Sequence, residues 1–106
     1  MQLPCRRFGR TNLEIPVLSL GGMRFQESWD ELKFSEITLN DQKKVENILS
    51  LANRFGFDHI ETAKYYGTSE IQLGMGFKSI KKIPKIIQTK IPPNREPKLF
   101  LSLIHI

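Results

Sequence analysis

The feature that most constrains the fold is an alternation of strand-like and helix-like segments that starts near residue 17. Three short apolar or β-branched runs, at 17–20, 57–62 and 86–91, are separated by helical stretches at about 40–55 and 69–79. Parallel strands need such crossovers, because the chain must return along the sheet before it can pair again. The sequence therefore predicts an α/β fold with parallel strands and crossover helices.

The first helix, expected over about 40–55, has the clearest pattern. Thr38 or Asn40 can cap its first turn, and Gly56 suits a left-handed cap at its end. Five apolar residues between these caps share a helical spacing: Val45, Ile48, Leu49, Ala52 and Phe55. They predict one apolar stripe that packs against the sheet.

The second helix is expected to begin after Thr68 or Ser69, either of which can cap it. Its inward-facing side chains are expected to be Ile71, Met75 and Phe77. Its two glycines either weaken the helix or allow close packing. A further helix start is expected at 96–97, where proline would occupy the first helical position.

The segments before the first helix are less regular. Residues 3–8 and 13–18 flank a turn at 9–12 and predict a β-hairpin. The run 17–20 is expected to be a strand buried on both faces. Residues 25–39 show no clear period, which predicts an irregular loop that packs some of its aromatic side chains.

Composition bounds the class of protein. At 106 residues the chain is one domain at most, and its single cysteine, Cys5, excludes an internal disulfide or a multi-cysteine metal site. It has no run of about 18 apolar residues and no signal-peptide core, so we expect a cytoplasmic protein without a membrane segment. The net charge of +5 allows anionic partners.

Polar candidates gather where the expected strands end, which is where parallel sheets and barrels bind ligands. Glu61 ends the second strand, Tyr66 lies in the loop after it, and Lys90 lies near the end of the third. If these strands are neighbours, Glu61 and Lys90 could form an ion pair with Tyr66 folded over both. The glycine pair after the first strand could let the backbone approach a ligand or a neighbouring element, or could form a plain turn.

This trio suits proton donation to a carbonyl group. A free tyrosine has a pKa of about 10 and is a poor acid at neutral pH, but a nearby ammonium stabilises the phenolate. Such a tyrosine can donate a proton to a carbonyl oxygen while a cofactor supplies hydride. The alternative is an ordinary ion pair beside a packing tyrosine. We expect His59 and Tyr65 to be structural.

Four motifs together resemble the N-terminal part of the aldo-keto reductases. They are Phe-Gly-Arg-Thr-Asn-Leu at 8–13, Leu-Gly-Gly-Met at 20–23, the run from His to Glu at 59–70, and Gln-Thr-Lys at 88–90. The resemblance implies a (β/α)8 TIM barrel closed at its floor by a hairpin. Residues 1–100 would supply the hairpin and about three of the eight strands. It also implies NADPH-dependent reduction of aldehydes or ketones by an acid, a tyrosine, a lysine and a histidine.

Carried over residue by residue, the resemblance makes Tyr66 the proton donor and Lys90 the residue that tunes it. Glu61 stands where most of the family has aspartate. Gly22, Met23 and Arg24 match the part that approaches the nicotinamide. The Glu-Thr-Ala and Gly-Thr-Ser-Glu pattern resembles a branch with a C-terminal ferredoxin-like segment. The parent protein could therefore hold iron–sulfur clusters, which this chain could not bind.

The end of the sequence departs from the family pattern. His105 comes too soon to match the family's histidine, and that histidine and the phosphate-binding half would follow later. Residues 101–106 lack a polar face and read like a translated sequencing adapter, with a natural apolar tail as the alternative. We therefore expect this chain to be an inactive fragment of a reductase.

Two other classes of function stay open. One is a barrel-derived binding protein that has lost catalysis, for which the glutamate at position 61 is the only hint. The other is a small basic nucleic-acid-binding protein, for which the only feature is a lysine cluster: Lys78, Lys81, Lys82 and Lys85. Because no zinc-finger spacing or RNA-binding motif accompanies that cluster, we expect a small-molecule carbonyl substrate and no nucleic acid.

Overall fold

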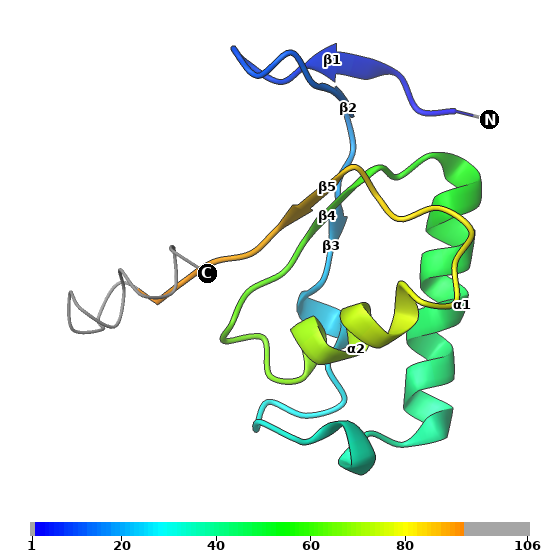
Figure 1. Ribbon diagram of the computed structural model, residues 1–106, viewed down its shortest axis with the longest axis vertical. Coiled ribbons are helices and arrows are strands. Elements are labelled where there is room, and N and C mark those ends of the chain that lie inside the picture. The colour runs from blue at the N-terminus through cyan, green and yellow to red at the C-terminus, as the bar shows by residue number, and fades with distance from the viewer. Residues whose placement is uncertain (1, 93–106) are drawn as a thin grey trace.

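A computed structural model describes residues 2–92, which form a β-hairpin, a parallel sheet and two α-helices (Figure 1). The expected helix start at 96–97, His105 and the tail at 101–106 lie outside the described residues. In chain order the elements are β1 (Cys5–Arg7), β2 (Glu14–Pro16), β3 (Leu20–Gly21), the short 3-10 helices η1 (Met23–Phe25) and η2 (Phe34–Glu36), α1 (Leu39–Phe55), β4 (His59–Glu61), α2 (Ser69–Gly76) and β5 (Ile86–Gln88).

The parallel sheet confirms the α/β prediction. Its strand order is β3-β4-β5, so each strand pairs with the next one along the chain, and α1 and α2 are the two crossovers. Leu20 is opposite Ile60, and Ile60 is opposite Ile87. This sequential order suits one side of a barrel. The sheet is open in the described part, so the closed barrel stays a prediction.

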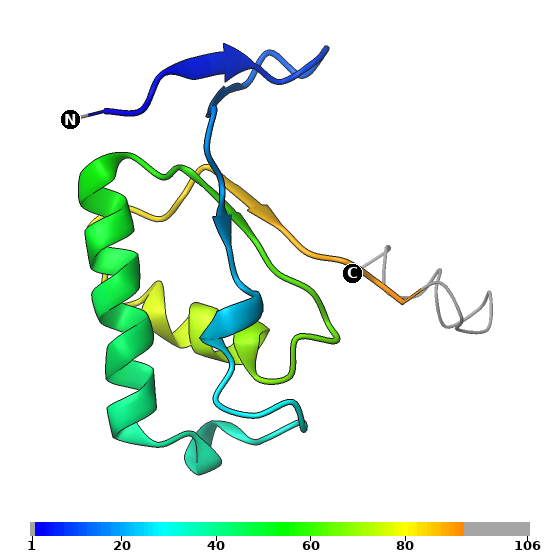
Figure 2. The same ribbon diagram turned by 180° about the vertical axis from the view of Figure 1, so that it is seen from behind.

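The core lies between the sheet and the two helices. It consists of one buried residue each from η1, β4 and α2 and two from α1: Phe25, Ile60, Leu73, Val45 and Leu49. The hairpin stands at the end of the sheet where the strands begin (Figures 1 and 2). Both η1 and the start of α2 lie at the other end, where the strands finish. The carboxyl edge of the sheet is therefore framed by these two helices.

The first expected strand was placed too early. Val17 and Leu18 are about half exposed, and the parallel strand begins only at Leu20. The amide of Val17 donates to the carbonyl of Pro4, so this segment prolongs the hairpin instead of joining the sheet. An apolar run indicates β structure, but it does not say which neighbour the strand will pair with.

Helix α1 follows its prediction closely. The Thr38 side chain accepts a hydrogen bond from the Asp41 amide, and Gly56 ends the helix with a φ of 80°. Val45, Leu49 and Ala52 are buried as expected. The other two residues of the expected stripe, Ile48 and Phe55, are exposed, so the packed face is narrower than the pattern predicted.

Helix α2 and the loop before α1 differ from expectation. Ile71, Met75 and Phe77 are only partly buried, and the buried residues of α2 are Ser69, Gln72, Leu73 and Gly76. In the loop, Phe25 packs in the core while Trp29 and Phe34 are exposed.

Among residues 2–92 the helices are too short or too polar to cross a membrane.

Candidate active site

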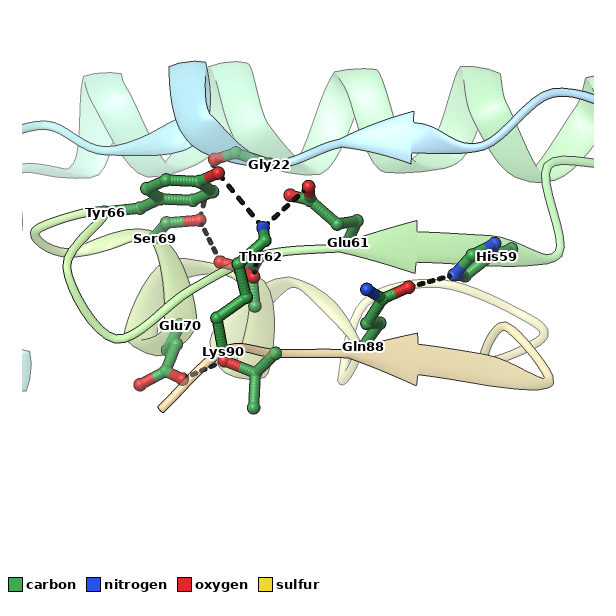
Figure 3. Close-up of polar contacts among 10 residues, drawn as sticks. Gly22, His59, Glu61, Thr62, Tyr66, Ser69, Glu70, Gln88 and Lys90 are labelled. Carbon is green, nitrogen blue, oxygen red and sulfur yellow. Dashed lines mark hydrogen bonds and ion pairs between the residues drawn. The ribbon is translucent and has the colours of Figure 1, made fainter. Parts of the chain in front are cut away.

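The end of β4 carries the first site residue. Since side chains alternate along a strand, Ile60 faces the helices while His59 and Glu61 point to the opposite face. Glu61 is opposite Gln88, and Lys90 follows two residues later on the same side. Figure 3 shows Glu61, Lys90 and Tyr66 converging at this edge. The contact predicted from parallel pairing is therefore present.

The ammonium group of Lys90 lies among three oxygen atoms. Its Nζ is 2.7 Å from Glu61 Oε2, 3.1 Å from the Tyr66 hydroxyl and 3.3 Å from the Thr62 carbonyl. An ammonium has three N–H donors and accepts nothing, so each donor has an acceptor. The same nitrogen lies 4.7 Å from the centre of the Tyr66 ring. This arrangement holds Lys90 in one position over the strand ends.

The charge of Lys90 is reinforced by its partners. The hydrogen bond to Glu61, followed by the one to Tyr66, raises the pKa of Lys90 above its ordinary value. The lysine is therefore an ammonium at neutral pH and must donate to the tyrosine oxygen. Because Tyr66 accepts from Lys90, its own hydroxyl proton is left to be donated elsewhere. This is the orientation that a proton donor requires.

Gly22 is a glycine because of its neighbours in the sheet. Its amide donates to the Glu61 carbonyl at 2.6 Å, and an added Cβ would lie 2.7 Å from that carbonyl oxygen and 3.3 Å from Thr62 Cβ. Of the explanations that the sequence left open, close approach of a neighbouring element is correct. Met23 and Arg24 follow in η1 and are exposed at the same edge. Contact of these three residues with a cofactor stays a prediction.

Sequence reasoning missed a set of buried polar residues behind the site. Thr62, Thr68, Ser69 and Gln72 are at most 3% exposed. Thr68 or Ser69 was expected to cap α2, and Thr68 does hold the N-cap position, but its side chain makes no capping hydrogen bond. The Ser69 hydroxyl instead bonds with Gly22 and Thr62. The signal for such a role, two hydroxyl residues at a helix start, is the same as the signal for a cap.

The loop between β3 and α1 is held against α2 by the same set. Glu27 donates its amide to Thr68 Oγ1 at 2.8 Å and to Gln72 Oε1 at 2.7 Å. Thr68 donates its own amide to the Ser28 carbonyl. Farther along the loop, Glu31 forms an ion pair of 2.8 Å with Lys64. The loop is thus fastened beside the Tyr66 turn.

His59 has a structural role, as expected. It is buried, with Nδ1 2.7 Å from Ser19 Oγ and Nε2 3.1 Å from Gln88 Oε1. Its ring centre is 6.4 Å from that of Phe8 in the hairpin turn. His59 therefore connects the hairpin turn to β4 and β5, two residues before Glu61 along β4.

Two further features bear on what the site could bind. A cavity of about 490 Å³ adjoins Lys90, but its lining includes neither Tyr66 nor Glu61, so we do not place a substrate there. Within residues 2–92, no three His, Cys, Asp or Glu side chains gather as a metal site would need. The described residues do not fit an iron–sulfur cluster.

Comparison with known proteins relates the chain to one family. The profile of the Aldo/keto reductase family matches residues 17–100. The chain is also similar to the crystal structure of a proposed aldo-keto reductase from Pseudomonas aeruginosa, with 30% identity and a TM-score of 0.63. That match covers 82% of this chain and 32% of the other, so this chain spans about a third of that protein. No curated protein matches the chain significantly.

Proposed function

The chain belongs to the aldo/keto reductase family, and on this premise we propose that the full-length protein reduces aldehydes or ketones to alcohols with NADPH. Membership of the family suggests an oxidoreductase. The observation that carries the proposal is the hydrogen bond of 3.1 Å from the Lys90 ammonium to the Tyr66 hydroxyl.

In the proposed reaction Tyr66 is the acid. Its hydroxyl donates a proton to the carbonyl oxygen as hydride adds to the carbonyl carbon, which yields the alcohol and a phenolate. The Lys90 ammonium, already directed at the tyrosine oxygen, stabilises that phenolate. Glu61 keeps Lys90 charged and in place. Water can then return a proton to Tyr66.

NADPH, when bound, supplies the hydride. The residues present fit only its nicotinamide end. Met23 and Arg24 are exposed at the edge that carries Tyr66 and would line that end. Gly22 offers no cradle for a ligand, because the Glu61 backbone occupies the space that a Cβ would take. We assign it the role of bringing β3 close to Glu61.

Two finer points belong to the proposal. An iron–sulfur segment in the parent protein rests on sequence resemblance alone, and iron analysis of the full-length protein would test it. A cytoplasmic location is supported by Cys5, which is exposed and a free thiol, as suits a reducing compartment.

A small-molecule substrate remains our proposal over nucleic acid. Lys82 and Lys85 both pair with Asp58, at 3.6 and 3.4 Å, so half of the lysine cluster already has an anionic partner. Salt-dependent retention of the full-length protein on DNA would contradict this part of the proposal.

The test is NADPH oxidation by the full-length protein with a panel of aldehydes and ketones. Tyr66→Phe removes the proposed acid and should lower kcat by about a hundredfold or more. Tyr65→Phe is the matched control, since it removes the same hydroxyl from the adjacent, exposed residue. Wild-type turnover in Tyr66→Phe would show that the assigned donor is wrong. Cofactor binding without any turnover would favour the catalytically inactive binding protein.

A further inference from the structure

We propose that Ser69 is a positioning residue for Lys90, acting through Thr62, whose backbone carbonyl is the third acceptor of the lysine ammonium. The catalytic consequence of this inference rests on the proposed function. The contacts that carry it, shown in Figure 3, do not depend on that function.

The hydroxyl groups of Thr62 and Ser69 form a directed chain. Ser69 is fully buried and Thr62 is 3% exposed. Ser69 Oγ donates to the Gly22 carbonyl at 2.8 Å, and Thr62 Oγ1 lies 2.8 Å from Ser69 Oγ. A carbonyl can only accept, so the Ser69 proton is committed to Gly22. Thr62 must therefore donate to Ser69, which gives the order Thr62 to Ser69 to Gly22.

Thr62 is held by its neighbours on every polar atom. Its amide donates to the Gln88 carbonyl at 2.7 Å, its hydroxyl donates to Ser69, and its carbonyl accepts from Lys90. The preceding carbonyl, that of Glu61, accepts from the Gly22 amide. The bond to Ser69 is the link in this set that reaches α2. It fixes the Thr62 side chain and, through it, the direction of the carbonyl that meets Lys90.

The position of Ser69 in the helix supports a tertiary role. The position that caps the start of α2 is held by Thr68, whose side chain makes no capping hydrogen bond, and Ser69 is the first residue of the helix. The Ser69 hydroxyl bonds to two other chain segments instead of to its own helix. Those segments are the residue after β3 and the residue after β4. Both adjoin Glu61, the other main partner of Lys90.

If the hydrogen bond between Thr62 and Ser69 had only a structural role, it would stabilise the fold without acting on Lys90. The test must therefore measure a property of Lys90 itself. Trace acetylation of the full-length protein, read lysine by lysine by mass spectrometry, reports how readily Lys90 yields a free amine. Exposed Lys81 serves as the internal standard. The measurement needs no turnover, so a protein that proves not to be a reductase would still give a valid answer.

Two variants each remove one of the two hydroxyl groups in the hydrogen bond between Thr62 and Ser69. Ser69→Ala and Thr62→Val should each raise Lys90 acetylation relative to Lys81 by about threefold near pH 9, because a charge-assisted hydrogen bond weakens. The double variant should add little, since both changes break one interaction. Thr62→Val keeps the side-chain volume and carries the test if Ser69→Ala fails to fold.

Thr68→Val is the matched control. It removes a buried hydroxyl one residue earlier, whose partners are in the loop and in Gln72, not in Thr62. It should leave Lys90 acetylation unchanged. Glu61→Gln is the positive control. It removes the ion pair of Lys90, so it should raise Lys90 acetylation and show that the assay responds to a lost partner. The inference is overturned if Ser69→Ala and Thr62→Val label Lys90 at the wild-type rate, or if Thr68→Val raises labelling as much as they do.

Discussion

The carboxylate of Glu61 lies 2.7 Å from the ammonium of Lys90. A glutamate therefore makes this contact at a position where most of the family has aspartate. The pair is only partly shielded, with the Lys90 side chain 46% and the Glu61 side chain 29% exposed. Solvent screening therefore limits its contribution to stability. Its effect is better sought in the charge state of Lys90 than in the free energy of unfolding.

Glu61→Gln should move the alkaline limit of activity to lower pH. Glu61 is the largest cause of the raised pKa of Lys90, so removal of its charge lowers that pKa, and the ammonium is lost earlier as pH rises. The pH profile of kcat/KM for wild type and variant measures this. Glu61→Asp keeps the charge and should shift the limit less. An unchanged alkaline limit in Glu61→Gln would contradict the assigned role.

Gly22→Ala should destabilise the protein by about 1–3 kcal/mol, because the new methyl group would press on the backbone carbonyl of Glu61. Urea unfolding measures the loss. Gly21→Ala is the control, because no atom lies within 4 Å of its added Cβ. Equal stability of the two variants would show that the close approach at Gly22 is not rigid.

The two glycines of α2 should respond to alanine with opposite signs. Gly74 has open space around it, so Gly74→Ala should stabilise by about 0.5–1 kcal/mol through helix propensity. At Gly76 the added Cβ would overlap the Leu49 side chain in the core, so Gly76→Ala should destabilise. Thermal unfolding distinguishes them. A stabilised Gly76→Ala would mean that Leu49 can move aside.

Asp58 should make stability depend on pH in the acid range. Burial raises the pKa of Asp58, but the Lys85 amide and the charges of Lys82 and Lys85 outweigh it and hold the pKa below 3.8. A carboxyl with a lowered folded pKa stabilises the fold above its unfolded pKa, and this is lost as pH falls through the folded value.

Asp58→Asn should therefore lower the Tm at pH 7, and the difference from wild type should shrink as pH falls below 3.8. Asp30→Asn is the control, since it makes the same chemical change at an exposed residue of the loop before α1. A difference in Tm that persists unchanged into strong acid would show that the ion pairs with Lys82 and Lys85 are not its cause.

Local signals in the sequence were enough to predict the α/β order and the limits of α1. The Thr38 cap and the Gly56 end depend on a few neighbouring residues, so they can be read from the chain. The meeting of Glu61 and Lys90 was also predictable, because adjacent parallel strands bring their carboxyl ends to one edge. The catalytic roles of these residues stay predictions.

The sequence by itself determined the order of the α-helices and parallel strands, and which reactive side chains stand at the strand ends. Tertiary structure alone decided that an added Cβ at Gly22, and not at Gly21, would meet the Glu61 carbonyl, that Val17 and Leu18 stay outside the sheet, and that the Ser69 hydroxyl bonds to Thr62 and Gly22. The reason is physical. Caps and periodicity arise from residues a few positions apart, whereas these contacts join atoms from segments about 7 to 47 residues apart, whose distance is set only when the sheet and helices pack.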